Sequence, residues 1–229
     1  MDHLPSLTIQ LALDRGSLDA LAALADDAAP YVSVIEVGTP VFMREGAHAL
    51  RVLREVCDRT GSLLFADSKI SDEGRAIAEV CAQGGADALS VVDGASFTTM
   101  RQVRQIADEH GLQVWVDLLS HSDPIIRARA LRPYVDGFTL HRTASGVPQM
   151  LVEGVLTIGP PVRLAGGITI DKVPVLREIA QATDGRFEGI VVGRAVTAAD
   201  DPLGALRDLY ARCTEPLAHD AGTLEALDV

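Results

Sequence analysis

The chain has 229 residues, of which 48% are hydrophobic and 23% are charged. This composition excludes a disordered chain, which lacks the apolar surface needed to offset the entropy lost on ordering. The net charge of −12 argues against nucleic acid and membrane surfaces as partners, because both are anionic. A small anionic substrate stays compatible with this charge, since a local cluster of backbone amides can outweigh a distant average charge.

Two further features bear on the cellular setting. The cysteines Cys57, Cys81 and Cys213 are sparse and lack metal-ligand spacing, which favours reduced thiols in a cytoplasmic protein. The N-terminal stretch has no basic start typical of a signal peptide. No run of about 18 uncharged apolar residues occurs, so we expect no transmembrane segment.

Short apolar runs alternate with helical patterns along the chain. The runs predict strands at Leu7–Leu13, Tyr31–Val37, Leu63–Ala66, Ala88–Val92, Gln113–Leu118, Gly137–Leu140, Val162–Ala165 and Gly189–Val192. Helices are predicted at Ser17–Ala28, Ala47–Arg59, Asp72–Gln83, Thr98–Glu109, Pro124–Leu131, Asp171–Ala180 and Pro202–Cys213. The connection before Val162–Ala165 carries Gly146, Pro148 and Gly154, which predicts that part of it is loop. The residues predicted to cap helices are Ser17, Asp72, Asp123, Asp171 and Asp201.

Strands that are apolar on both faces and alternate with helices are typical of a parallel sheet covered by helices. Eight such units of about 25 residues each predict a closed (β/α)8 TIM barrel in the α/β class, spanning residues 1–213. The acidic stretch 214–229 is interpreted as a tail. The alternative is an open doubly wound sheet, but its GxGxxG fingerprint is absent, since the first strand runs into Asp14-Arg15-Gly16-Ser17.

Polar residues close nearly every predicted strand, and the carboxyl ends of barrel strands meet at one mouth. These residues are Asp14, Glu36, Asp67, Lys69, Asp93, Asp117, His141, Gly166, Gly167, Gly193 and Arg194. An acid at a strand end can also cap the following helix. Helix capping is therefore the alternative to a functional role for each of these acids taken alone. Capping fits Glu36 poorly, because it is followed by Val37-Gly38-Thr39-Pro40 and not directly by a predicted helix.

The densest cluster is Asp67-Ser68-Lys69-Ile70-Ser71-Asp72. Alternation in an extended segment predicts that Asp67 and Lys69 point to the same side. A lysine between carboxylates stays protonated and can stabilise an oxyanion in a transition state. Glu36 and Asp67, at adjacent strand ends, suit Mg²⁺, although hydrogen bonding to Lys69 is the alternative for the pair.

Two late glycine motifs, Ala165-Gly166-Gly167-Ile168 and Val192-Gly193-Arg194, follow the last two predicted strands. Phosphate sites in barrels commonly form there, because glycine lets a ligand approach backbone amides closely. Arg194 would add a planar charged group that matches phosphate. Ordinary turn glycines are the alternative.

These residues carry a family resemblance that runs from residue 9 to about 210. Besides the two glycine motifs and His141, the matching stretches are Ile9–Asp14, Ile35–Pro40, Asp67–Asp72 and Val116–Leu118. The chain thereby resembles the orotidine-monophosphate-decarboxylase-like suprafamily of ribulose-phosphate-binding barrels, whose pattern D-x-K-x-x-D occurs at Asp67–Asp72. Within it the chain looks most like the 3-hexulose-6-phosphate synthases and their sisters, the 3-keto-L-gulonate-6-phosphate decarboxylases (KGPDC).

The resemblance implies a homodimer, Mg²⁺ and an enediolate derived from a sugar phosphate. It implies that Glu36 and Asp67 are metal ligands and that Lys69 stabilises the enediolate. Asp72 resembles a residue contributed across the dimer interface. Asp14 resembles a carboxylate that orients the lysine and binds a substrate hydroxyl. His141 resembles a proton-transfer histidine, with Asp117 assisting it.

Individual positions favour one sister family over another. Glu36 stands where nucleotide decarboxylases typically have lysine; Asp117, Ala144 and Ala165 match the synthases, whereas Arg194 is more typical of the KGPDC family. We therefore expect a Mg²⁺-dependent aldolase-type lyase that joins D-ribulose 5-phosphate to formaldehyde, giving D-arabino-3-hexulose 6-phosphate. The alternatives are decarboxylation of 3-keto-L-gulonate 6-phosphate and a non-catalytic barrel that binds sugar phosphates.

Overall fold

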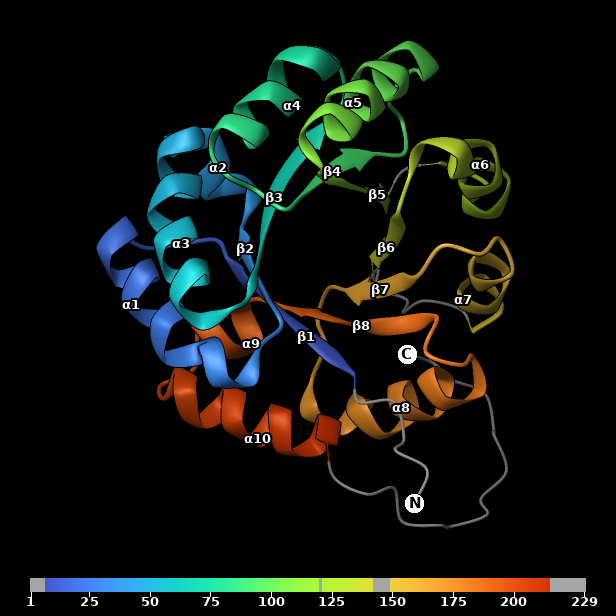
Figure 1. The fold of residues 1–229 in the computed structure, drawn as a ribbon. Helices are drawn as coiled ribbons and strands as arrows, with labels where there is room; N and C mark the ends of the chain where they lie inside the picture. Colours follow the sequence, from blue (N-terminus) through green and yellow to red (C-terminus); the bar gives the residue numbers. More distant parts are fainter. Residues whose placement is uncertain (1–6, 120, 142–148, 215–229) are drawn as a thin grey trace.

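A computed structural model describes residues 7–119, 121–141 and 149–214. Eight parallel strands close into a barrel in chain order, with helices around it (Figure 1). The strands are β1 (Thr8–Leu13), β2 (Val34–Val37), β3 (Leu63–Ile70), β4 (Ala88–Val92), β5 (Gln113–Leu118), β6 (Gly137–His141), β7 (Val162–Ala165) and β8 (Phe187–Val192). Because β8 pairs with β1, with Ile9 opposite Ile190, the closed barrel is confirmed and the open sheet is excluded.

The helices follow the expected alternation. They are α1 (Leu18–Ala28), α2 (Thr39–Glu45), α3 (Ala47–Thr60), α4 (Gly74–Gln83), α5 (Phe97–His110), α6 (Pro124–Leu131), α7 (Gln149–Leu156), α8 (Val173–Ala182), α9 (Arg194–Thr197) and α10 (Pro202–Thr214). The short 3-10 turns are η1 (Ala29–Tyr31), η2 (Arg132–Tyr134) and η3 (Ile170–Lys172). Within the described ranges, no helix combines the length and the apolar run that a membrane crossing needs. Residues 142–148, and 215–229 of the predicted tail, lie outside the described residues.

Several boundaries differ from the prediction for local physical reasons. The second strand was expected from Tyr31, but η1 contains Pro30 and β2 begins only at Val34. Proline has no N–H to give to a strand ladder, so the 3-10 turn forms instead. Helix α2 was not predicted, because the stretch Val37-Gly38-Thr39-Pro40 was not expected to lead directly into a helix, although proline is well tolerated in a first helical turn.

The predicted helix caps divide into confirmed and wrong ones. Ser17 accepts from Ala20 N at 3.3 Å, Asp123 from Ile126 N at 2.9 Å and Asp201 from Gly204 N at 3.0 Å, so these three are confirmed. Asp72 is not the cap of α4, because the chain passes through Glu73 at φ 47° before the helix begins. Asp171 is not a cap either, since it lies inside η3 after Thr169.

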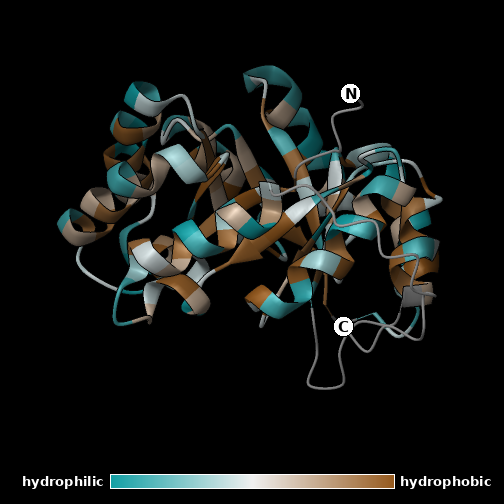
Figure 2. Ribbon diagram, turned by 90° about the horizontal axis from the view of Figure 1, so that it is seen from below, coloured by the Kyte–Doolittle hydropathy of each residue, from teal (hydrophilic) through white to brown (hydrophobic). Residues whose placement is uncertain are grey.

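The two faces of the strands have different partners. Outward side chains such as Ile9, Leu11 and Leu13 are buried against the helices and form the main hydrophobic core. Figure 2 shows the strands largely hydrophobic at the centre, with hydrophilic residues on the helices around them. Many inward residues are instead polar and buried: Gln10, Glu36, Asp67, Ser90, Asp117, Thr139 and Arg163. The expectation of strands apolar on both faces therefore holds only in part for the inner face, where these polar residues lie beside an apolar cluster of Val34, Phe65, Ala88 and Trp115.

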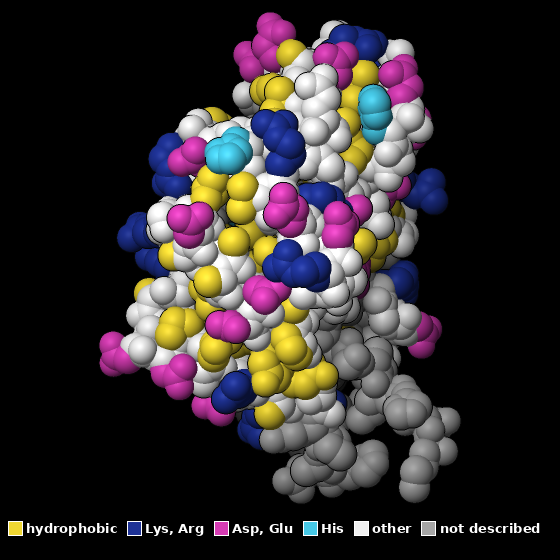
Figure 3. Space-filling model, turned by 60° about the vertical axis from the view of Figure 1, so that its left-hand side comes forward, with side chains coloured by type: hydrophobic (Ala, Val, Ile, Leu, Met, Phe, Trp, Pro, Cys, Tyr) yellow, Lys and Arg dark blue, Asp and Glu magenta, His cyan; other side chains and the backbone are white. Residues whose placement is uncertain are grey.

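Charged side chains are dispersed over one face of the outer surface (Figure 3). On the face that includes the left side of Figure 1, acidic and basic side chains are interspersed with small hydrophobic areas (Figure 3). No broad basic area is visible on this face.

Candidate active site

A cavity of about 550 Å³ opens at the carboxyl ends of the strands. Nine residues expected there from the sequence line it: Asp14, Glu36, Asp67, Lys69, His141, Gly166, Gly167, Gly193 and Arg194. Thr39, Ile168 and Thr169 also line it and were not predicted. Since parallel strands bring distant residues to one rim, the cavity assembles side chains from β1, β2, β3, β6 and the loops after β7 and β8.

Lys69 reaches the cavity from an irregular part of β3. The pairing of β3 with β4 shifts between Ala66 and Ile70, and Lys69 has a positive φ of 42°. Ser90 on β4 supports this bulge, because its hydroxyl accepts from Lys69 N at 2.9 Å and donates to Asp67 Oδ1 at 2.8 Å. Bulges redirect side chains near active sites in this way. The sequence analysis did not predict a role for Ser90, although a serine within the apolar run Ala88–Val92 could have indicated one.

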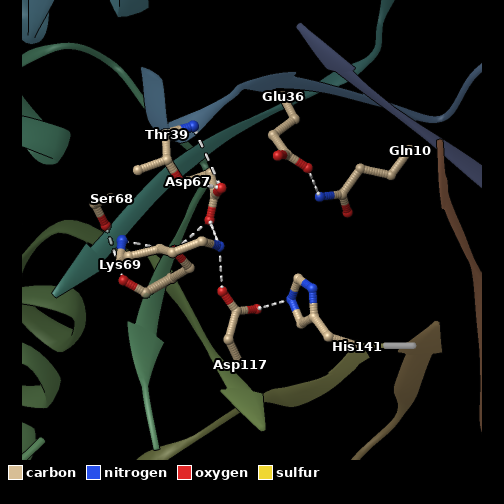
Figure 4. Close-up of polar contacts among 9 residues, drawn as sticks. Gln10, Glu36, Thr39, Asp67, Ser68, Lys69, Asp117 and His141 are labelled. Carbon is tan, nitrogen blue, oxygen red and sulfur yellow. Dashed lines mark hydrogen bonds and ion pairs between the residues drawn. The ribbon is translucent and has the colours of Figure 1, made fainter. Parts of the chain in front are cut away.

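The ammonium group of Lys69 lies between two carboxylates (Figure 4). Nζ is 2.7 Å from Asp67 Oδ1 and 2.6 Å from Asp117 Oδ2, so the predicted common side for Asp67 and Lys69 is confirmed. Burial lowers the pKa of Lys69, but the charges and hydrogen bonds of Asp117 and Asp67 outweigh it and raise the pKa above the usual value. Lys69 is therefore a stable cation at neutral pH, suited to stabilise negative charge rather than to accept a proton.

Asp117 lies behind the cavity wall and joins Lys69 to His141. Its Oδ1 is 3.3 Å from His141 Nε2, an ion-pair distance when the imidazole is protonated. Burial raises the pKa of Asp117, but His141 and Lys69 together lower it below the usual value. The carboxylate is thus ionised, and it can stabilise an imidazolium that forms when His141 takes up a proton.

Glu36 is the most enclosed carboxylate of the cavity, with 5% of its surface exposed. Burial and the nearby charge of Asp67 raise its pKa well above the usual value, while a hydrogen bond from Gln10 lowers it in part. On the other carboxylate, Asp67 Oδ2 accepts from the backbone N–H of Thr39 at 3.3 Å and from its hydroxyl. Thr39, in the first turn of α2, therefore orients Asp67.

The opposite wall of the cavity is built from backbone. Gly166 and Gly167 have φ of 90° and 61°, a region that other residues enter only with strain. Gly193 and the exposed Arg194 follow β8 on the same wall. The small side chains of Ala12, Ala165 and Val191 form a buried cluster that also lines the cavity. A ligand can therefore lie close to the backbone here.

Three other acids singled out in the sequence occupy different settings. Asp14 lines the cavity, and burial together with the charge of Asp67 raises its pKa. Asp93 was expected at the mouth, but it is fully buried and its Oδ2 accepts from His121 N at 3.0 Å, so that expectation is wrong. Asp72 is exposed and lies outside this chain's cavity, and its role at a dimer interface stays a prediction. Ala144, used above to separate the sister families, lies outside the described residues.

Comparisons with known proteins agree with this geometry. A family model described as orotidine 5′-phosphate decarboxylase / HUMPS family matches residues 8–209. The 3-hexulose-6-phosphate synthase of Mycobacterium gastri is 29% identical over 212 residues, covering 90% of this chain and 99% of the relative.

Two solved structures share the fold. The 3-hexulose-6-phosphate synthase from Salmonella typhimurium has a TM-score of 0.79 and 27% identity, covering 90% of this chain and 98% of its own. KGPDC from Streptococcus mutans has a TM-score of 0.76 and 25% identity, covering 92% of this chain and 97% of its own. Both similarities cover at least 90% of this chain.

Proposed function

Because the chain belongs to the orotidine 5′-phosphate decarboxylase / HUMPS family, we propose that it is a carbon–carbon lyase acting on a phosphorylated ketose, of the 3-hexulose-6-phosphate synthase type. The reaction would join D-ribulose 5-phosphate to formaldehyde and give D-arabino-3-hexulose 6-phosphate. The observation that carries the proposal is the Lys69 ammonium, held by Asp67 and Asp117 in the same cavity as a glycine-rich wall.

Substrate binding would use the two walls differently. The phosphate would lie against the backbone amides of Gly166, Gly167 and Gly193, with the guanidinium of Arg194 beside it. Asp14, whose carboxylate lies beside Gly193, would accept a hydrogen bond from a sugar hydroxyl. Binding energy at the phosphate then holds the reacting carbons in place at the charged wall, which reduces the entropic part of the barrier.

A Mg²⁺ ion fits Glu36 and Asp67. Glu36 is buried beside a second carboxylate, and within the described residues no ion pair joins it to a lysine or an arginine. No cluster of three or more His, Cys, Asp or Glu in those ranges forms a complete cage, so water and substrate oxygens would fill the remaining positions, as is usual for Mg²⁺. When bound, the ion would polarise substrate oxygens and lower the energy of developing negative charge.

The protein's own groups account for the proton transfers. His141 would remove the proton from C1 of ribulose 5-phosphate, and the C–H electron pair would form the enediolate. The ionised Asp117 would stabilise the resulting imidazolium. Lys69 would donate hydrogen bonds to the negatively charged oxygens. C1 would then form the new bond to the formaldehyde carbon, and the former aldehyde oxygen would take the proton back from His141.

The proposal includes two features that concern the whole molecule. The protein would act as a homodimer in which Asp72, exposed after β3, reaches the site of the partner subunit. It would work in the cytoplasm, which agrees with three free and buried cysteines.

A substrate panel tests the proposal. The protein is incubated with Mg²⁺ and ribulose 5-phosphate, with and without formaldehyde, and separately with 3-keto-L-gulonate 6-phosphate. We expect formaldehyde consumption that Lys69→Ala abolishes while its circular dichroism stays that of the wild type. Release of CO2 from the gulonate would support the sister activity instead, which Arg194 favours. Full formaldehyde consumption by Lys69→Ala would refute the mechanism. No turnover of any of these substrates by the wild type would favour a non-catalytic barrel that binds sugar phosphates.

A further inference from the structure

An arginine lies inside the barrel beneath the cavity. Arg163 on β7 is 2% exposed and precedes the cavity-lining Ala165 by two residues, so its side chain lies one layer deeper. Barrel interiors are usually filled at this depth by branched apolar side chains. Because a buried guanidinium must be paired and hydrogen-bonded, its contacts show what it does.

The guanidinium of Arg163 has three distinct contacts. Nη2 pairs with Glu188 Oε1 at 2.7 Å, and the planar group stacks on Trp115, 3.8 Å from the ring centroid. Nη1 donates to Gln10 Oε1 at 2.6 Å. The ion pair and the ring fix the position of the guanidinium, so its third contact is made from a rigid support.

This third contact determines which way the amide of Gln10 faces. Arginine has only donors, so the carbonyl oxygen of Gln10 must face Arg163. The NH2 group of Gln10 must then face the other neighbour, and Nε2 does donate to Glu36 Oε2. A reversed amide would direct its oxygen at a carboxylate and its NH2 at a guanidinium, and both contacts would be repulsive.

We infer that Arg163 is a positioning residue that fixes the carboxylate of Glu36 through Gln10. One oxygen of Glu36 is held by Gln10, and the carboxylate lines the cavity beside Asp67 (Figure 4). The inference rests on the proposed function, in which Glu36 and Asp67 hold the divalent cation. It adds a residue that touches neither cation nor substrate and that controls the geometry of the cation site from below.

Binding of Mn²⁺, followed by the electron paramagnetic resonance signal of the free ion, measures this geometry without turnover. Arg163→Met removes every donor, and we expect Mn²⁺ affinity to fall at least tenfold. Arg163→Lys keeps a cationic donor and is expected to recover most of the affinity. Arg177→Met is the matched control: this arginine is also buried, with 5% exposed, but lies on α8 away from the cavity, so affinity should stay at the wild-type value.

A double-mutant cycle separates positioning from general destabilisation. If Arg163 acts through Gln10, then Gln10→Met and the double variant should each lose about as much affinity as Arg163→Met alone. Wild-type affinity in folded Arg163→Met, or losses that add in the double variant, would overturn the inference. Should Arg163→Met not fold, Gln10→Met and Arg163→Lys still decide between these outcomes.

Glu36→Gln separates this inference from the proposed function. If the wild type binds Mn²⁺ no better than Glu36→Gln, the metal part of the proposed function fails. The crystal structure of Arg163→Met, or of Arg163→Lys if the methionine variant does not fold, then decides the positioning. A displaced Glu36 carboxylate or a reoriented Gln10 supports the inference, and an unchanged pair of side chains contradicts it.

Discussion

The two walls of the cavity have opposite constructions. The wall formed by β1–β3 presents ionisable side chains, and Lys69 on this wall pairs both with Asp67 and with the deeper Asp117 of β5. The wall after β7 and β8 presents glycines and only one charged side chain, Arg194. One side thus supplies fixed charges and the other supplies backbone. The difference teaches that the chemistry and the anchoring of a ligand are separable, and substitutions on the two walls should change different kinetic constants.

The largest expected effect comes from removing the cation of the charged wall. Lys69→Met should lower kcat by roughly 100- to 1,000-fold, as for the loss of a donor to a developing oxyanion, with little change in KM. Steady-state kinetics with saturating Mg²⁺ measures both constants. Lys172→Met, which removes the chain's other lysine, serves as the control. A rise in KM alone would show that Lys69 anchors substrate and would abolish the distinction between the walls.

On the backbone wall, Arg194→Ala should change KM and leave kcat nearly unchanged. Loss of one charge-assisted hydrogen bond to phosphate predicts about a tenfold increase in KM for the sugar phosphate, with kcat nearly unchanged. Arg194→Lys keeps the positive charge but lacks the planar guanidinium, so its KM should lie between those of the wild type and Arg194→Ala. The same kinetic assay checks this, and a fall in kcat with constant KM would count against phosphate binding at Arg194.

The charged wall can also be strained without removing any of its ionisable side chains. A Cβ on Gly38 would lie 2.2 Å from Asp14 Oδ1 and 3.0 Å from Leu13 O, so Gly38→Ala must displace Asp14. We expect a loss of about 1–3 kcal/mol in the free energy of unfolding, measured by urea denaturation. In an Asp14→Ala background the same substitution should cost less, because only the backbone contact remains. An equal cost in both backgrounds would contradict this packing.

The smallest effect concerns the stability of the charged wall in acid. The pKa of Asp117 lies below its usual value of 3.8 in the folded protein, so the folded state binds fewer protons than the unfolded one in this range. The stability that Asp117 contributes is fully present above pH 3.8 and is lost as the pH falls through the lowered pKa. Urea denaturation from pH 6 to 2 should show a shallower decline for Asp117→Asn than for the wild type. Parallel curves would mean that Asp117 is not ion-paired in solution.

The sequence by itself determined the barrel and most of the cavity lining. Apolar runs of strand length, separated by helical patterns, leave few alternatives to a closed parallel barrel, and closure brings residues at strand ends such as Asp14, Glu36 and His141 to one rim. Because these properties are periodic and local, they could be predicted from residue order. The pattern Asp67–Asp72 also indicated the ion pair of Asp67 with Lys69, since the two residues are neighbours on one strand.

Only the tertiary structure decided which inward groups touch. Asp93 follows a strand as Asp14 does, yet its carboxylate accepts a hydrogen bond from His121 N and does not line the cavity. Arg163 and Gln10 are 153 residues apart, and their contact exists only because barrel closure places β7 and β1 on either side of β8. Ser90 likewise accepts a hydrogen bond from Lys69 N at a bulge in β3 that the residue pattern of this strand does not predict. Hydrogen bonds between distant residues depend on distances of a few tenths of an ångström, and barrel closure and strand register set those distances.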